Sequence, residues 1–227
     1  IKAREILDCR LEPTLQVDVW TEDGDLGRAD VPCGRSTGKN EAKQVRDGGS
    51  RFDGKGVLEA VERINQVVAP EIVGRKVTDQ RGIDEVMIEL DGTKDKSRLG
   101  GNVITGVSLS VLKAAANALD TPLYRYIGGT NSHVLPIPLL DVIEGGKLAA
   151  NDLDFQEHHI IPVGAETFSE AIRIGAEVYF ELGRILEEDW GKTSLNVGFE
   201  GGYTPRKMKD PRDAFDEILK AISELGY

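Results

Sequence analysis

The sequence predicts two folded parts of different class, an α+β part followed by an α/β part. In the first part, a two-stranded hairpin comes before several amphipathic helices. In the second part, strands and helices alternate along the chain, which is the order typical of a parallel sheet with helical crossovers. The glycines Gly128 and Gly129 and the polar run that ends at His133 mark the break between the parts. We therefore expect one domain over residues 1–133 and a second over residues 134–227.

The composition is that of an ordinary globular protein. The 227 residues are 40% hydrophobic, which supports a packed core, and carry a net charge of −11. This acidic balance, with no basic cluster, argues against nucleic acid as a partner. No apolar run approaches the roughly 18 residues of a membrane span, and the first residues show no signal-peptide pattern, so we expect a cytoplasmic protein without a membrane partner. Cys9 and Cys33 are too few for a disulfide framework or a zinc site.

The first part begins with a hairpin and continues with helices. Residues 15–20 alternate apolar and polar side chains, a turn follows, and residues 27–31 return, which predicts two antiparallel strands. Apolar residues then recur at helical spacing over 57–68, 80–90 and 102–119. The last of these helices contains three consecutive alanines, whose small side chains favour close packing.

A loop between the hairpin and the helices is the first candidate for a binding function. Residues 32–38 are rich in glycine and contain Ser36 and Thr37, and residues 41–46 favour the start of a helix. One interpretation is that the hydroxyls and backbone amides contact a phosphate or a metal-bound ligand. The alternative is a mobile connection without a ligand. The loop lacks the lysine and spacing of a P-loop, so a nucleotide cradle is not supported.

The second part alternates between strands and helices. We expect strands over residues 135–143, 155–163 and 194–197, and helices over residues 168–188 and 211–225. Strands joined through helices are typical of a parallel sheet, in which functional residues gather at the carboxyl ends of the strands.

Charged side chains lie inside this apolar pattern. The period of two in a strand places Glu157 and His159 on one face, and Glu200 follows one helix later, where an apolar segment breaks into glycines. Acids at two strand ends suggest one site, although each is also compatible with an ordinary polar residue at the end of a strand. For His159 two interpretations stay open: it shares a cavity with the two acids, or it packs against its neighbours with a satisfied hydrogen bond.

Six short motifs are spread over the whole chain in a specific order. They are Ala-Arg-Glu-Ile-Leu-Asp at 3–8, Gly-Arg-Ser-Thr-Gly at 34–38, Ile-Glu-Leu-Asp-Gly-Thr at 88–93, Pro-Leu-Tyr-Arg-Tyr-Ile-Gly-Gly at 122–129, Phe-Gln-Glu at 155–157 and Glu-Gly-Gly at 200–202. This set resembles the enolase family. The resemblance implies an N-terminal α+β capping domain and the first part of an α/β barrel of the TIM type. It also implies magnesium-dependent, reversible dehydration of 2-phosphoglycerate to phosphoenolpyruvate, the lyase reaction of glycolysis and gluconeogenesis, in a homodimer or higher homo-oligomer.

The resemblance also assigns roles to individual residues. Ser36 matches a loop serine that closes on the metal-bound substrate, a small phosphorylated carboxylate. Glu157 and Glu200 match two acids of the elimination machinery, with Glu200 assisting departure of the hydroxyl group. His159 is added here as a substrate contact because it shares the face of Glu157. The family's magnesium ligands and base lysine are expected after Tyr227, because residues 134–227 are far fewer than the roughly 250 of a complete barrel.

Several positions depart from the family pattern at these same motifs. The departing residues are Arg35, Glu144, Leu148, Phe199 and the pair His158 and His159. Their concentration near the site suggests a diverged pocket and supports a second hypothesis, in which an impaired or repurposed enolase-like protein serves as a binding or assembly component. The sequence leaves open which of the two hypotheses holds.

Overall fold

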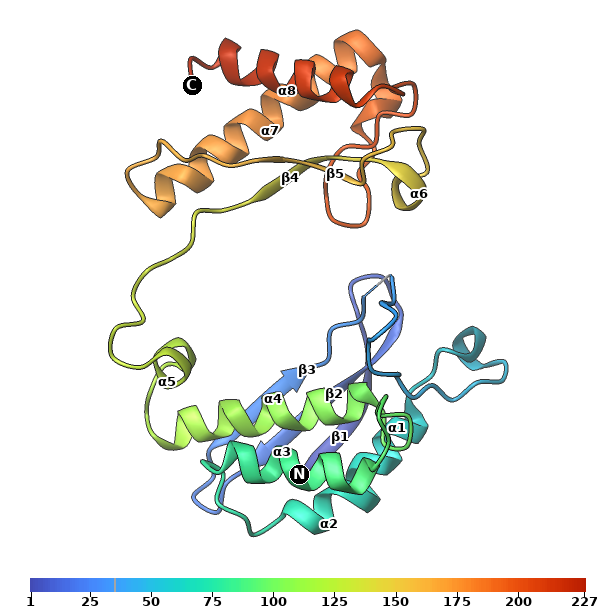
Figure 1. The fold of residues 1–227 in the computed structure, drawn as a ribbon, viewed down its shortest axis with the longest axis vertical. Helices are drawn as coiled ribbons and strands as arrows, with labels where there is room; N and C mark the ends of the chain where they lie inside the picture. Colours follow the sequence, from blue (N-terminus) through green and yellow to red (C-terminus); the bar gives the residue numbers. More distant parts are fainter. Residues whose placement is uncertain (35) are drawn as a thin grey trace. The chain divides into compact units, whose positions relative to one another are not determined.

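The computed structural model describes residues 1–34 and 36–227, without the side chain of Leu148. The chain divides into two compact units, residues Ile1–Ser132 and His133–Tyr227. Figure 1 shows their elements, and each unit is described by itself. Arg35 lies outside the described residues. None of the helices among the described residues is both long and apolar enough to cross a membrane.

The sheet of the first unit has three antiparallel strands in the order β1–β2–β3: β1 (Lys2–Leu7), β2 (Pro13–Trp20) and β3 (Leu26–Asp30). The predicted hairpin is confirmed, since β2 pairs with β3 through Val17 opposite Ala29. The sequence analysis did not predict β1. In this strand only Ala3 has a fully buried side chain, so the apolar alternation that reveals β2 is weak.

Helices follow the sheet, as predicted. The first runs through α1 (Leu58–Glu62), a π-helical turn η2 (Arg63–Val68) and α2 (Ala69–Ile72), and the others are α3 (Gln80–Asp91), α4 (Gly101–Ala118) and α5 (Leu123–Gly128). A short 3-10 turn, η1 (Arg51–Gly54), comes before them.

The helix start expected over residues 41–46 is wrong, because this segment has no regular structure. Two of its backbone amides bond to distant partners instead of to the preceding turn. Lys43 donates to the carbonyl of Asp95 at 2.8 Å, and Val45 donates to the side chain of Asn102 at 2.9 Å. A helix would need those amides for its own carbonyls four residues earlier.

Helix α4 lies along one face of the sheet (Figure 1) and holds the core of the first unit together. The backbones approach closely because Gly27 in β3 has no side chain. A Cβ atom there would lie 2.0 Å from the carbonyl oxygen of Ser110 and 2.3 Å from the amide nitrogen of Ala114. The hydroxyl of Ser110 also donates to the carbonyl of Val17 at 2.8 Å. The contact therefore depends on small residues on both elements.

The opposite face of the sheet carries a buried carboxylate. Asp18 is fully buried beneath two arginines and accepts hydrogen bonds from Arg28 at 2.6 and 2.9 Å and from Arg4. The bonds from Arg28, together with those from Arg4, outweigh burial and lower the pKa of Asp18 to about 2. This side of the sheet is thus closed by ion pairs rather than by a second apolar layer.

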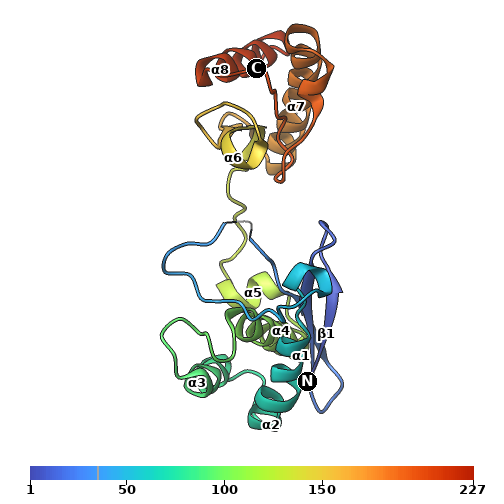
Figure 2. The same ribbon diagram turned by 90° about the vertical axis from the view of Figure 1, so that its right-hand side faces the viewer.

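The second unit contains β4 (Leu140–Glu144), the one-turn helix α6 (Gly146–Ala149; Figure 2), β5 (Glu157–Ile160), α7 (Phe168–Trp190), the 3-10 turn η3 (Lys192–Leu195) and α8 (Pro211–Glu224). Both long helices are confirmed. Thr167 is the N-cap of α7, and its hydroxyl accepts a hydrogen bond from the amide of Glu170. Asp210 is the N-cap of α8, whose first residue is a proline.

The parallel sheet expected for this part is corrected in two respects. Strands β4 and β5 pair antiparallel, because the segment between them holds only the single turn of α6 and not the long helical crossover that parallel neighbours require. Residues 194–197 do not form a strand. The chain there makes η3 and then isolated bridges of Tyr203 with Val197 and, in parallel orientation, with Ile143. Among the described residues of this unit, the bridge between Ile143 and Tyr203 is therefore the place where parallel pairing occurs.

The close packing of β3 against α4 predicts the effect of one added methyl group. Gly27→Ala should lower the free energy of unfolding by about 1–3 kcal/mol, because the new Cβ meets backbone atoms that cannot move aside freely. Gly38→Ala is the matched control, since its Cβ would meet only the side chain of Glu41, at 3.8 Å. Urea unfolding of both variants checks this, and equal stabilities would contradict the packing argument.

Candidate functional site

An irregularity in the register of β4 and β5 gathers ionisable side chains on one face. Asp141 lies opposite His159, and Glu144 lies opposite Glu157. Two steps along β5 thus match three steps along β4, so β4 carries one extra residue, a β-bulge. Without the bulge, the alternation of side chains would turn Asp141 and Glu144 to opposite faces. With it, both join Glu157 and His159.

The other face of this pair is apolar. Val142, Ile143 and Ile160 are buried in the core of the second unit, which α7 and α8 complete with Leu182, Leu186 and Ile218 among others. His158 also lies on this side, between Phe155 and Phe215. Its Nδ1 lies 3.1 Å from the carbonyl oxygen of Ile143, and burial lowers the pKa of its imidazole. We infer that His158 has a packing role and takes no part in the site.

The segment that carries Glu200 is tied to β4 through Glu144. The side chain of Glu144 is buried, with 4% exposure, and its Oε1 accepts the backbone N–H groups of Glu200 and Gly202, both at 2.9 Å. The approach is possible because Gly198 and Gly202 have no side chains. A Cβ atom at Gly198 would lie 1.9 Å from Glu144 Oε2. The glycines that break the apolar segment in the sequence therefore make room for a carboxylate.

Glu157, Glu200 and His159 lie together at the accessible part of this face. His159 Nε2 is 3.4 Å from Glu157 Oε2, and their side chains are 29% and 27% exposed. The neighbouring Glu157 raises the pKa of Glu200, first by accepting a hydrogen bond from the protonated Glu200 carboxyl group and then through its negative charge. The three candidates from the second part of the sequence are thus neighbours.

Asp141 is a member of this face that the sequence analysis did not single out. Both of its carboxylate oxygens are buried and accept no hydrogen bond from the described residues. Burial, followed by the charge of Glu144, raises the pKa of Asp141 to about 6. The sequence does show a carboxylate within the apolar run of residues 139–143, which could have marked Asp141 as a candidate. Which residues lie beside it depends on the bulge, which the sequence does not reveal.

The remaining candidates lie elsewhere or beyond description. Ser36 is exposed and belongs to the first unit, whereas Glu157 and Glu200 belong to the second. Arg35 falls outside the described residues, as does the side chain of Leu148. Phe199 is half exposed beside Glu200. The acidic face is therefore built from the second unit alone.

The face does not fit a metal ion. Carboxylate oxygens are the donors that Mg²⁺ prefers, yet no group of three or more His, Cys, Asp or Glu side chains within residues 1–34 and 36–227 converges as ligands would. The carboxylate of Glu144 is already engaged by two amides, and that of Glu157 lies beside His159. The arrangement is suited to holding protons.

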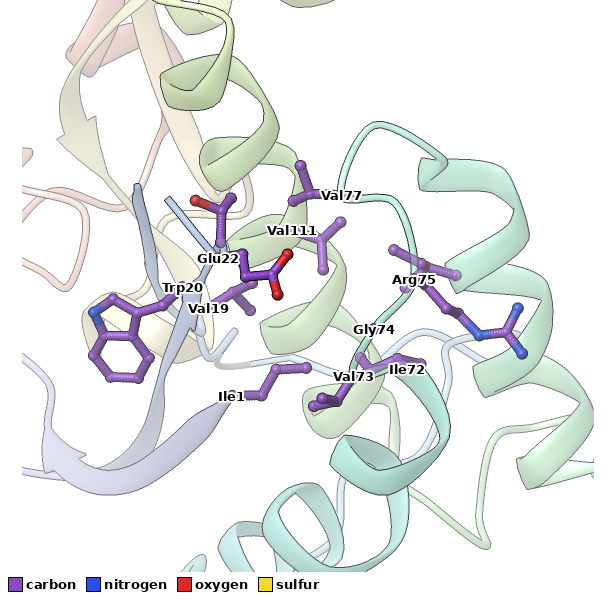
Figure 3. Close-up of a pocket in the computed structure, with 12 residues that line it drawn as sticks. Ile1, Val19, Trp20, Glu22, Ile72, Val73, Gly74, Arg75, Val77 and Val111 are labelled. Atoms are coloured by element: carbon purple, nitrogen blue, oxygen red, sulfur yellow. The ribbon is translucent and has the colours of Figure 1, made fainter. Parts of the chain in front are cut away.

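A separate pocket of about 560 Å³ belongs to the first unit (Figure 3). Its wall is mostly apolar and includes Val19, Ile72, Val77 and Val111, while the side chain of Arg75 points away from it. Its lining includes none of the candidate site residues, and it lacks the convergent polar groups of a catalytic cavity.

The raised pKa of Asp141 predicts a dependence of stability on pH. The folded protein holds this proton more tightly than the unfolded chain, so the resulting stabilisation is complete below about pH 4 and is lost as the pH rises through about 6. At pH 8, Asp141→Asn should therefore be more stable than the parent by about 1 kcal/mol, after allowance for solvent screening, and the gain should shrink toward pH 4. Urea unfolding at both pH values checks this, with exposed Asp154→Asn as the control. A gain that is the same at both pH values would contradict it.

Comparisons with known proteins cover the whole chain. Residues 1–127 match the family model for the enolase N-terminal domain, and residues 132–227 match that for the enolase C-terminal TIM barrel domain. The second unit, with its β4–β5 pair and the helices α7 and α8, is accordingly the start of a TIM barrel domain.

Curated relatives agree with the family models. The enolase of Methanothrix thermoacetophila is 57% identical over 227 residues, which are 100% of this chain and 54% of the relative. The enolase of Thermococcus kodakarensis is 56% identical over 225 residues, 99% of this chain and 52% of the relative. The enolase of Pyrococcus furiosus is 54% identical over 227 residues, 100% of this chain and 52% of the relative. The chain spans about half the length of these relatives, and it belongs to the enolase family.

Proposed function

We propose that the protein is a lyase that dehydrates 2-phosphoglycerate reversibly to phosphoenolpyruvate. The observation that carries the proposal is the placement of Glu157, Glu200 and His159 together on the accessible part of the acidic face, where Glu157 raises the pKa of Glu200. Elimination of water requires a proton for the departing hydroxyl group, and a carboxyl group with a raised pKa is a suitable donor near neutral pH. The identity of 54–57% with relatives named enolase supports the same reaction.

In this proposal Glu200 is the general acid and Glu157 its partner. Elimination removes a carbon-bound proton of the substrate as well as its hydroxyl group. A base, which the family resemblance implies to be a lysine, takes the carbon-bound proton, its electron pair forms the double bond, and the hydroxyl group departs as water with the proton of Glu200. Glu200 is left as a carboxylate beside Glu157 and regains a proton from solvent before the next turnover. In the reverse direction Glu200 accepts the proton of the attacking water. His159, within reach of Glu157, is proposed to contact the substrate.

The other parts of the proposal rest on the family resemblance. We propose a small phosphorylated carboxylate as the substrate, Mg²⁺ as the cofactor, Ser36 as a loop contact to the bound substrate or metal, a homo-oligomer as the assembly and the cytoplasm as the location. Among the described residues, no group of three or more His, Cys, Asp or Glu side chains is arranged to hold Mg²⁺, so the role of Glu200 is proposed without it. The alternative, a binding or assembly component without catalysis, is less favoured because the two acids lie together and the pKa of Glu200 is raised by its neighbour Glu157, as suits a proton donor.

Glu200→Gln tests the general acid. In the natural protein that carries this sequence, assayed with Mg²⁺, the substitution should lower kcat for dehydration by about 10²–10⁴-fold with little change in KM, because the amide fills the same space but donates no proton to the leaving group at useful rates. Exposed Glu187→Gln on α7 is the control for charge alone. Retention of the parental kcat would exclude Glu200 as the acid. A parent without turnover would favour the binding component.

His159→Phe tests the proposed substrate contact. Loss of the imidazole should raise KM for 2-phosphoglycerate several-fold, because a polar partner within the site is replaced by an apolar ring of similar size. The measurement is the initial rate over a range of substrate concentrations. An unchanged KM and kcat would assign His159 a packing role only.

A further inference from the structure

Glu144 holds the segment that carries Glu200 from behind. This residue ends β4, and its backbone N–H donates to the carbonyl of Tyr203 at 2.9 Å while its side chain accepts from Glu200 and Gly202. The backbone and the side chain of Glu144 thus both form hydrogen bonds with the segment of residues 200–203. One of these bonds goes to the backbone N–H of Glu200 itself. The carboxylate of Glu144 therefore fixes the position from which the side chain of Glu200 extends.

The charge of Glu144 has a second effect that its hydrogen bonds do not explain. A neutral amide oxygen would accept the same two N–H groups, so geometry alone does not require an ionised residue. Glu144 faces Asp141, Glu157 and Glu200. Burial first, and then the charge of Glu144, raises the pKa of Asp141; the neighbouring Glu157 and burial raise the pKa of Glu200, and the charge of Glu144 adds to that. Of the ion pairs between described residues, the one on this face is His159 with Glu157. Among the described residues, no lysine or arginine forms an ion pair with Glu144.

We propose that Glu144 is the positioning residue of Glu200: its buried carboxylate fixes the backbone of residues 200–202 through two amide hydrogen bonds and places a negative charge directly behind Glu200. This inference rests on the proposed function, because the position and charge behind Glu200 matter only if a leaving group takes its proton. Glu144 does not touch the substrate. It acts through Glu200, and it should set the upper pH limit of dehydration, since the general acid works only while protonated.

Glu144→Gln separates the two effects. The glutamine can accept both amide bonds, so the segment stays in place, but the charge is gone. The falling alkaline limb of the kcat profile should move toward lower pH by about one unit, as expected for removal of one nearby charge, with little change in KM. Glu144→Ala removes both effects and should lower kcat across the whole pH range. Asp141→Asn, which removes another charge from the face, should move the limb in the same direction as Glu144→Gln.

Titration of the Glu200 carboxyl, followed by NMR of the natural protein with ¹³C-labelled glutamate, reports the same charge without turnover. Glu144→Gln should lower the pKa of Glu200, and exposed Glu187→Gln should leave it unchanged. An unmoved profile and an unmoved titration would overturn the inference. So would a glutamine variant that loses activity at every pH as alanine does, because that shows a structural role only. If the parent fails to dehydrate 2-phosphoglycerate, the proposed function fails, while the titration still decides the effect of Glu144.

Discussion

The register of β4 against β5 is the constraint on which the site depends. One extra residue in β4 brings Asp141 and Glu144 to the face of Glu157 and His159 while Ile143 stays in the core. A strand without the bulge would have to bury a carboxylate in the apolar layer or expose an isoleucine. Since burial of an unpaired charge costs far more than exposure of one apolar side chain, the bulge is the arrangement that satisfies both faces.

Crowding of carboxylates on one face opposes folding, and the apolar layer behind it has to compensate. The raised pKa of Asp141 corresponds to about 1 kcal/mol at neutral pH once solvent screening is considered. Each fully buried residue behind the strands, such as Ile143 or Leu182, contributes about 1.5–3 kcal/mol. A few such residues therefore outweigh the repulsion. This comparison explains how a small sheet of two strands holds an unfavourable cluster without unfolding.

The elements that the sequence predicted are those with a strong local period. Helices α4, α7 and α8 have apolar stripes and are found as expected, and the period of two placed Glu157 beside His159. The antiparallel return of β5, the bulge and the contact of Glu144 with Glu200 depend on residues up to 56 positions apart. A local sequence pattern carries no information on such long-range pairings. For this reason Asp141 was not predicted as a member of the site, and Glu144 was recognised only as a departure from the family pattern.

Four carboxyl groups on one face would repel an anionic substrate if all were fully charged and exposed, but these four differ in burial and in charge. Glu144 lies buried behind the amides of Glu200 and Gly202, whose N–H groups point at its carboxylate and offset part of its charge. Burial and the charge of Glu144 raise the pKa of Asp141 to about 6, and Glu157 raises the pKa of Glu200, so both groups hold a proton more tightly than a free carboxyl group does. The field at the accessible surface is therefore weaker than four carboxylates would suggest. The buried charge still acts on Glu200 at short range, where the dielectric screening is least, so one set of acids can hold a proton without closing the site to an anion.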